Sequence, residues 1–226
     1  MVITEIRPVA YIYNDFKEKF GIPRQPGKVS AFSEIVFEPE YRDPSALKGI
    51  DGFSHLWLVF DFSKSHKKEF SPTVRPPRLG GNKRVGVFAS RSPFRPNSLG
   101  LSCVKLRGIK ETDEKGTILL VEGADILNGT PIYDIKPYVP YSDCIANAQP
   151  GYTAQNSDYR LCAELSCENK VLNEQSLKEV FEILAEDPRP SYQNDPLKVY
   201  KLRYGDADVH FRVEDKKAII TEIKAL

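Results

Sequence analysis

The sequence predicts a mainly β protein that ends in a small α+β unit. Short apolar, strand-like segments separated by turn residues fill the first 140 residues, and an amphipathic helix followed by three more strand-like segments lies within 159–226. Many short strands with Pro, Gly and Asp/Asn turns are typical of an antiparallel barrel or sandwich. Strands and helices do not alternate here, which disfavours a doubly wound nucleotide-binding fold.

The first part, 1–142, is expected to form the β-barrel. Its strand-like segments are separated by turns such as "PRQPGK", "KGIDG" and "LNGTP". Segment 29–37 alternates between apolar and polar residues, and 55–62 is a continuous apolar run. The expected strands are 29–37, 55–62, 84–90, 101–106 and 117–127. The polar, turn-rich stretch 143–158 reads as a linker.

The last part, 159–226, has a different pattern. Ser176 and Glu179 have the spacing of a capping box, and Pro188 ends the helical pattern. Three strand-like segments follow, at 198–204, 208–213 and 218–223. One helix against a three-stranded meander makes a small α+β domain. The apolar residues with helical spacing are Leu177, Val180, Phe181 and Leu184.

Composition excludes several classes of protein. Of the 226 residues, 41% are hydrophobic, and no apolar run reaches the roughly 18 residues that a membrane span requires. The N-terminal stretch lacks the apolar run of a signal peptide, so a cytoplasmic protein is expected. The four cysteines have irregular spacings, which indicates reduced, mostly structural thiols. The three histidines lack the spacing of metal ligands, so no metal site is expected.

Charge is unevenly distributed although the net charge is only +1. Residues 1–110 carry 19 Lys/Arg against 10 Asp/Glu, and no acidic residue occurs between Phe70 and Lys110, where nine basic residues lie. One interpretation is a solvated face whose partners come from the acidic second half. The other is a surface that binds an anion or a nucleic acid, and the clustering and the excess of arginine over lysine in this window favour it.

The stretch "GVFASRSPFRPNSLGLS" (86–102) concentrates this charge in a stiff loop. Arg91 and Arg95 alternate with Pro93 and Pro96 and have no acidic neighbour in the sequence. Guanidinium groups suit phosphates and base edges. From the residues alone, the sequence therefore predicts a β-rich, anion-binding protein with a proline-stiffened arginine loop.

Five motifs resemble the TsaA-like family in the same order and spacing. They are "EKFGIPRQPG" (18–27), "GFSHLWLVF" (52–60), "RPPRLGG" (75–81), the arginine loop and "DILNGTPIYDIKPYVP" (125–140). The later "LAEDPRPSY" (184–192) is similar to the C-terminal domain of the family's bacterial tRNA methyltransferase branch, TrmO. Ser98 stands where many relatives carry a proline. The resemblance implies a dimeric, S-adenosylmethionine-binding β-barrel that methylates N6 of threonylcarbamoyladenosine beside the tRNA anticodon.

The resemblance also implies which residues contact the cofactor. Each has an alternative: Gly27 can serve only a turn, Leu101 only the core, and Arg91 can be a plain surface charge. Carried over motif by motif, the expected cofactor contacts are Gln25, Pro26, Gly27, Lys64, Ser65, Arg91, Leu101, Asp125, Ile126, Leu127 and Asn128.

Two further sets concern the nucleic acid and the chemistry. The expected tRNA-binding residues are Arg75, Arg78, Arg84 and Arg95. In "DIKPY", Asp134 and Lys136 share one face of an extended segment with Tyr138 beyond, because side chains two apart point the same way. Asp134 is a candidate to accept a proton or hydrogen bond from the adenine N6 group. A structural Asp134–Lys136 ion pair is the alternative.

The sequence thus predicts an S-adenosylmethionine-dependent tRNA (adenine-N6)-methyltransferase that works as a homodimer. Two other classes remain open. A non-catalytic tRNA-binding module would bind tRNA without the cofactor. A hydrolase or lyase acting on S-adenosylmethionine would consume the cofactor without RNA.

Overall fold

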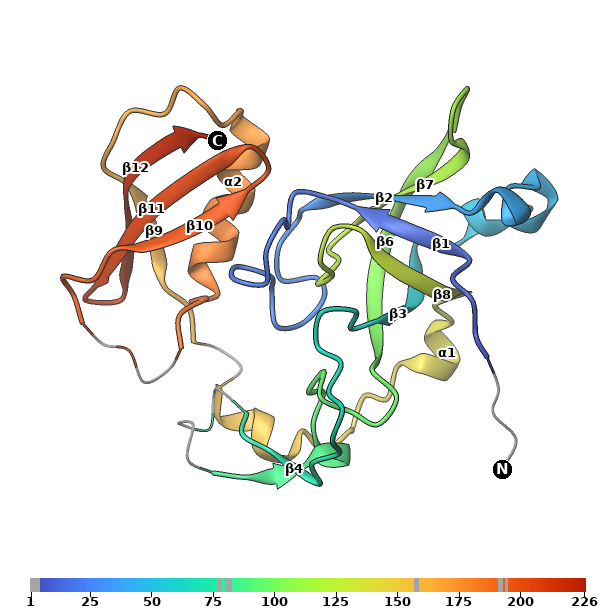
Figure 1. Ribbon diagram of the computed structural model, residues 1–226, viewed down its shortest axis with the longest axis horizontal. Helices are drawn as coiled ribbons and strands as arrows, with labels where there is room; N and C mark the ends of the chain where they lie inside the picture. Colours follow the sequence, from blue (N-terminus) through green and yellow to red (C-terminus); the bar gives the residue numbers. More distant parts are fainter. Residues whose placement is uncertain (1–4, 77–78, 80–82, 157–158, 191–192, 194) are drawn as a thin grey trace.

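The computed structural model describes residues 5–76, 79, 83–156, 159–190, 193 and 195–226. Its larger sheet is antiparallel and pairs in the order β1-β2-β7-β6-β3-β8; β8 pairs back to β1, so the sheet closes into a barrel (Figure 1). The mainly β fold predicted from the sequence is confirmed. The six strands are β1 (Ala10–Tyr13), β2 (Phe32–Phe37), β3 (His55–Asp61), β6 (Leu99–Thr112), β7 (Gly116–Glu122) and β8 (Thr130–Pro137).

Alternation along the strands fills the barrel. On β3, Leu56, Leu58 and Phe60 are buried, while Trp57 and Val59 between them are only partly buried. Successive side chains of a strand point to opposite faces, so the buried set faces the interior and the other set lies outside. Ile12, Ile35, Val104 and Leu119 complete the core from the neighbouring strands.

Several strand predictions were wrong in detail. Segment 84–90 contains only β5 (Val85–Gly86), followed by a 3-10 turn at Val87–Ala89, and the strand expected at 117–127 ends at Glu122. Strands β1 and β8 were not predicted. β1 has only four residues, and β8 carries Pro131 and Pro137, a residue type that is rare inside a sheet; only the "DIKPY" stretch was expected to be extended. These two segments become strands because they pair with each other and with β2 and β3.

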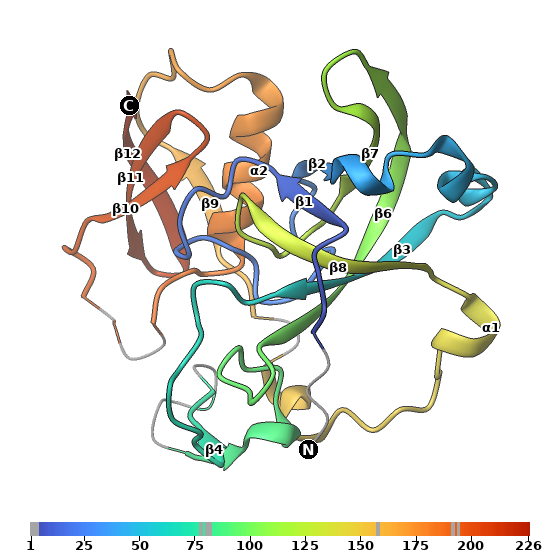
Figure 2. The same ribbon diagram turned by 45° about the vertical axis from the view of Figure 1, so that its right-hand side comes forward.

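A two-stranded ribbon lies apart from the barrel strands. β4 (Thr73–Val74) pairs with β5, and this ribbon, here called the β4–β5 arm, lies below the barrel in both views (Figure 1 and Figure 2). After β8 the chain enters the short helix α1 (Pro140–Asp143) and a connection with a 3-10 turn at Gly151–Asn156. No helix in the described part of the chain has the length and apolar character that a membrane span requires.

The C-terminal part packs one helix, α2 (Glu174–Ala185), against a four-stranded sheet. The predicted three-stranded meander is present, but β9 extends it by pairing parallel with β12, a pairing that local sequence does not reveal. Asn173, not Ser176, caps the helix: its side chain accepts from the Ser176 backbone N–H at 2.8 Å. The strands are β9 (Cys162–Leu165), β10 (Tyr200–Tyr204), β11 (Ala207–Glu214) and β12 (Lys217–Ala225).

Segment 14–31 joins the two parts. It leaves β1, lies between the barrel and the C-terminal sheet, and returns into β2 (Figure 1). Phe16, Val29 and Ala31 are buried in the same cluster as α2 and the C-terminal strands. Gly21 has φ +91°, and a Cβ there would lie 2.2 Å from Leu202 Cδ1. The C-terminal core therefore depends on residues from the first part of the chain.

Candidate functional site

The turn at Gln25–Gly27 is the first part of the candidate site. The Gly27 N–H donates to the Gly123 carbonyl at 2.8 Å, which fixes the turn beside the chain that leads to Asp125. Gly27 has φ +71°, a conformation that glycine adopts at little cost. A Cβ there would meet no atom within 4 Å, so the space beside this backbone is open.

Arg91 connects this turn to the arginine loop. Its Nη1 donates to Gln25 Oε1 at 2.5 Å. The Arg91 guanidinium also interacts electrostatically with Asp125. Three segments that are distant in sequence therefore meet around one exposed arginine.

Arg95 has a different environment from Arg91. Its Nη1 donates to the carbonyls of Val87 and Ser90, at 3.2 and 2.7 Å, and its guanidinium lies 5.8 Å from the Phe88 ring centroid. This arginine braces its own loop. Its predicted contact with tRNA stays a prediction.

Asp125 is the chemically distinctive residue of "DILN". Its carboxylate accepts from Ser102 Oγ at 2.6 Å. Burial raises the pKa of Asp125 to about 6, while Ser102 and Arg91 oppose that rise. The carboxylate is thus mostly ionised at neutral pH but close to its titration range.

The other members of this motif have structural contacts. Ile126 is buried in the barrel core, and its carbonyl accepts from Asn14 Nδ2 at 2.9 Å. Asn128 Oδ1 accepts from the Asn14 N–H at 2.9 Å, and the Leu127 carbonyl accepts from the Thr130 N–H at 3.2 Å. Their main effect is to fix the start of segment 14–31 beside Asp125.

Lys64 and Ser65 form a turn after β3. Lys19, from segment 14–31, donates through Nζ to the Lys64 carbonyl and to Ser65 Oγ, the latter at 3.2 Å. The turn is therefore attached to the same segment that carries Gln25 to Gly27. The Lys64 side chain itself is exposed.

Leu101 and Ser102, the serine that donates to Asp125, point to opposite faces of β6. Ser102 is fully buried opposite Leu58, whereas Leu101 is 54% exposed opposite Val59. Val59 also pairs with Asp134 on β8, so Leu101, Val59 and Asp134 form one row across the outer face. Leu101 thus lies on the outer face of β6, whereas Asp125 contacts the buried Ser102 of the same strand.

The carboxylate of Asp134 forms an ion pair. Lys136 Nζ lies 2.7 Å from Asp134 Oδ2, and both side chains are about half exposed or more, at 66% and 48%. Asp134 Oδ1 accepts from the Ile135 N–H at 2.9 Å. Tyr138 packs beside Trp57, with ring centroids 5.8 Å apart. The carboxylate remains accessible to a ligand on the outer face.

The acid-free window of the sequence is divided in space. Arg75 and Arg84 lie on the β4–β5 arm, where Arg84 Nη1 donates to Thr73 Oγ1 at 3.1 Å. Arg107, by contrast, pairs with Glu122, its Nε lying 2.6 Å from Oε2. Arg78, the remaining predicted tRNA contact, lies outside the described residues.

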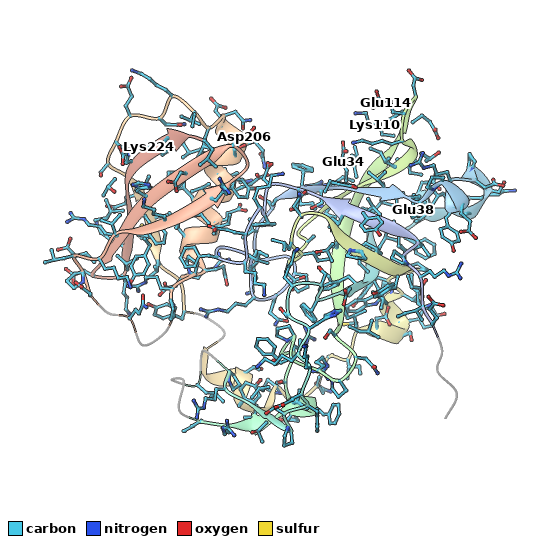
Figure 3. All side chains as sticks on the ribbon, viewed as in Figure 1. Glu34, Glu38, Lys110, Glu114, Asp206 and Lys224 are labelled. Atoms are coloured by element: carbon cyan, nitrogen blue, oxygen red, sulfur yellow. The ribbon has the colours of Figure 1, made fainter. Side chains whose placement is uncertain are left out.

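The far hairpin does not belong to this site. Figure 3 labels Glu34, Lys110 and Glu114 around the β6–β7 hairpin, at the opposite end of the barrel from the β4–β5 arm. A shallow, polar hollow there mixes acidic and basic side chains. Among the described residues, no cluster of three or more His, Cys, Asp or Glu side chains is arranged to hold a metal ion.

The sequence reasoning missed several residues of the site. Ser102 sits inside the arginine-loop motif, and Lys19 inside "EKFGIPRQPG", but neither has a distinctive pattern of its own. His66 Nε2 lies 2.7 Å from Asp61 Oδ1, next to the Lys64–Ser65 turn. The five-residue separation of this pair gives no sequence signal, because the turn alone brings the two side chains together.

Family models match both parts of the chain. The model described as the tRNA-methyltransferase O N-terminal domain matches residues 11–144, and the TrmO C-terminal domain model matches residues 158–226. The chain belongs to the TrmO family. The resemblance read from the motifs is thereby confirmed.

TrmO-family relatives match over nearly the full chain. An Escherichia coli K12 protein named tRNA (adenine(37)-N6)-methyltransferase is 38% identical over 222 residues, covering 93% of this chain and 94% of the relative. A Pseudomonas aeruginosa relative, named as a candidate S-adenosylmethionine-dependent methyltransferase, is 40% identical and covers 91% of each chain. The crystal structure of TrmO from Pseudomonas aeruginosa superposes with a TM-score of 0.77 at 32% identity, covering 99% of this chain and all of the other.

Proposed function

We propose that this protein transfers a methyl group from S-adenosylmethionine to N6 of the adenosine beside the tRNA anticodon, and that this adenosine carries a threonylcarbamoyl group. The observation that carries the proposal is the near full-length match to a relative named for this reaction. Family membership does not favour the two alternatives, a non-catalytic tRNA-binding module and a hydrolase or lyase acting on the cofactor.

The residues around Gln25 to Gly27 fit the cofactor. The backbone at Gly27 borders open space, so a ligand can approach its peptide groups closely. Bound S-adenosylmethionine supplies an electrophilic methyl group on a sulfonium cation. The carboxylate of Asp125 offsets the charge of Arg91 and gives the site an anionic group for a cationic ligand.

Asp134 is the proposed acceptor for the adenine N6 group. Its carboxylate is accessible on the outer face and is oriented by Lys136 and by the Ile135 N–H. The carbamoylated N6 nitrogen of this nucleoside is a weak nucleophile, so holding it in line with the methyl group is the main catalytic requirement. Its proton can leave late, to this carboxylate or to water. Tyr138, beside Trp57, borders the same region and is proposed to limit the position of the base.

The β4–β5 arm is the proposed contact for tRNA phosphates. Arg75 and Arg84 extend from the barrel on this arm. Phe88 is 75% exposed at the base of the arm, and unpaired RNA bases stack on such aromatic faces. We infer a homodimer, because the exposed Leu99 and Leu101 give the outer face of β6 an apolar strip that a second copy can cover. We also propose a cytoplasmic enzyme, since the proposed substrate is a tRNA.

The direct test is mass spectrometry of tRNA nucleosides from cells that lack the protein. Loss of the N6-methylated nucleoside, its restoration by the wild-type gene and its poor restoration by Asp134→Asn are expected. An unchanged nucleoside profile in the deletion strain would exclude the proposed reaction. Incubating purified protein with S-adenosylmethionine alone separates the hydrolase or lyase alternative, which requires consumption of the cofactor without RNA.

A further inference from the structure

The turn after α2 is held in an unusual conformation. Asp187 has φ +48°, which is uncommon for a residue other than glycine. Arg189, only 7% exposed, binds both carboxylate oxygens of Asp187, at 2.8 and 3.0 Å, and Tyr159 Oη donates to the same carboxylate at 3.2 Å. A costly backbone conformation that several contacts maintain is a reason to look for a function.

This turn directs two backbone carbonyls at one arginine of the first part of the chain. Arg24 Nη2 donates to the Asp187 carbonyl at 3.3 Å and to the Arg189 carbonyl at 3.1 Å. Both carbonyls can face one nitrogen because the Asp187–Arg189 pair fixes the turn. The motif "EDPRP" therefore has a specific contact in the fold, across more than 160 residues of sequence.

Arg24 directly precedes the candidate cofactor turn. The next residue, Gln25, accepts from Arg91, and Gly27 is bonded to Gly123. Within the described part of the chain, hydrogen bonds attach the turn to the arginine loop, to the strand connection that leads to Asp125, and to the C-terminal part. Losing the Arg24 side chain removes the last of these attachments at the N-terminal side of the turn.

Other contacts join segment 14–31 to the C-terminal part away from this turn. Glu18 Oε1 accepts from the Arg203 N–H at 3.0 Å, and Glu182 Oε2 accepts from the Ser30 N–H at 2.6 Å. These contacts hold the two parts of the chain together without touching the residues around Gln25. Breaking one of them is therefore a matched control, because it weakens the attachment between the two parts of the chain without changing the contacts of Arg24.

We propose that Arg24 is a positioning residue through which the Asp187–Arg189 turn holds the Gln25–Gly27 segment in its cofactor-binding conformation. The C-terminal part therefore sets cofactor affinity in the barrel without contacting the cofactor. This inference rests on the proposed function for its ligand, but the attachment itself does not depend on which ligand binds.

The first measurement needs no ligand. In the full-length protein, Arg24→Ala is expected to speed amide hydrogen exchange in the peptide that contains Gly27, because the Gly27 N–H is protected by its bond to Gly123. Glu18→Ala breaks a contact between the same two parts and is expected to leave exchange in that peptide unchanged. Unchanged exchange in Arg24→Ala, or equal acceleration in both variants, would overturn the proposal.

The second measurement uses S-adenosylmethionine. Arg24→Ala is expected to raise its KM and its calorimetric Kd about tenfold, the range of coupling between distinct sites, with kcat at saturation nearly unchanged. Arg24→Lys keeps one charged donor and is expected to recover part of the affinity. A wild-type affinity in Arg24→Ala would overturn the proposal. Wild-type protein that binds no S-adenosylmethionine would instead overturn the proposed function, while the exchange result still decides the role of Arg24.

Discussion

Asp125 shows how one side chain is subject to opposing demands. Burial beside the barrel core disfavours its ionised form, and this raises its pKa from 3.8 to about 6. Ser102 and Arg91 favour the ionised form and recover part of that loss. The anionic group that we propose for the cationic cofactor is thus kept at a cost in fold stability, a compromise that is common at functional sites.

The sign of the pH effect follows from this raised pKa. The folded protein holds the Asp125 proton more tightly than the unfolded chain between pH about 4 and 6, so the contribution of this group to the free energy of unfolding falls as pH rises through that window. Well above pH 6 the loss is complete, on the order of 1–3 kcal/mol. Asp125→Asn should therefore be more stable than wild type at pH 7.5, and this difference should be much smaller at pH 4.5.

Denaturant unfolding at the two pH values measures this difference. Asp134→Asn, which removes an exposed carboxylate paired with Lys136, is the control and should change stability by less than about 1 kcal/mol. The same Asp125→Asn protein should bind S-adenosylmethionine more weakly while losing less affinity for S-adenosylhomocysteine, which has no sulfonium charge. Equal losses for the two ligands would mean that Asp125 acts through hydrogen bonding or local structure.

Among the elements, the described part of the β4–β5 arm is held by backbone pairing and by a contact with the arginine loop. Two residues pair on each strand, and the Val87 N–H donates to the Pro72 carbonyl at 2.9 Å where the arm meets the arginine loop. Arg84 is tied across the ribbon to Thr73. The arm places Arg75 and Arg84 at the opposite end of the barrel from the acidic groups of the β6–β7 hairpin, although the acid-free window of the sequence runs up to that hairpin.

Removing charge from the arm should weaken RNA binding. Arg75→Ala combined with Arg84→Ala is expected to lower tRNA affinity and to reduce the slope of log affinity against log salt by about two, one unit for each phosphate that the variant no longer neutralises. Cofactor affinity should not change. The matched control is Lys110→Ala with Lys115→Ala, which removes the same charge at the far hairpin, where Lys115 pairs with Glu34.

Titrating tRNA at several salt concentrations by fluorescence anisotropy measures both quantities. If tRNA responded only to the overall charge of the protein, the two double variants would show the same slope of log affinity against log salt. That result would remove the arm from the proposed RNA interface.

At the scale of the whole molecule, the two parts of the chain share one core. Phe16 and Val29 are buried against α2 and the C-terminal strands, and Gly21 packs directly on Leu202. The sequence-based division into 1–142, 143–158 and 159–226 stays a prediction, yet the shared core means that the C-terminal part cannot be removed without exposing side chains of segment 14–31.

The predicted homodimer is tested by light scattering on the wild type and on a variant of the exposed apolar strip. Leu101 on the outer face of β6 is 54% exposed, and Leu99 is 37% exposed. Light scattering should report a dimer, and Leu99→Arg should shift the protein toward monomer and weaken S-adenosylmethionine binding, because the cofactor is expected near the interface. A monomeric wild type that binds the cofactor at full strength would contradict this arrangement.

Local sequence determined a substantial part of the fold. The apolar run that became β3 and the helical spacing of α2 were both readable, because burial on one face imposes its period on neighbouring residues. The family motifs, in order, were equally readable. Elements that depend on distant partners were not: β1 and β8 become strands by closing the barrel on each other, and β9 by pairing parallel with β12.

The candidate site divides in the same way. The sequence by itself determined the membership in the TrmO family and named Gln25, Arg91 and Asp125. Only the tertiary structure decided their environments: Arg91 bonds to Gln25, Arg95 turns onto its own loop, and the C-terminal turn holds Arg24. The reason is physical. Periodicity and motifs record what each residue must be, whereas the direction of a hydrogen bond and the cost of burying a charge depend on groups that folding brings together from far along the chain.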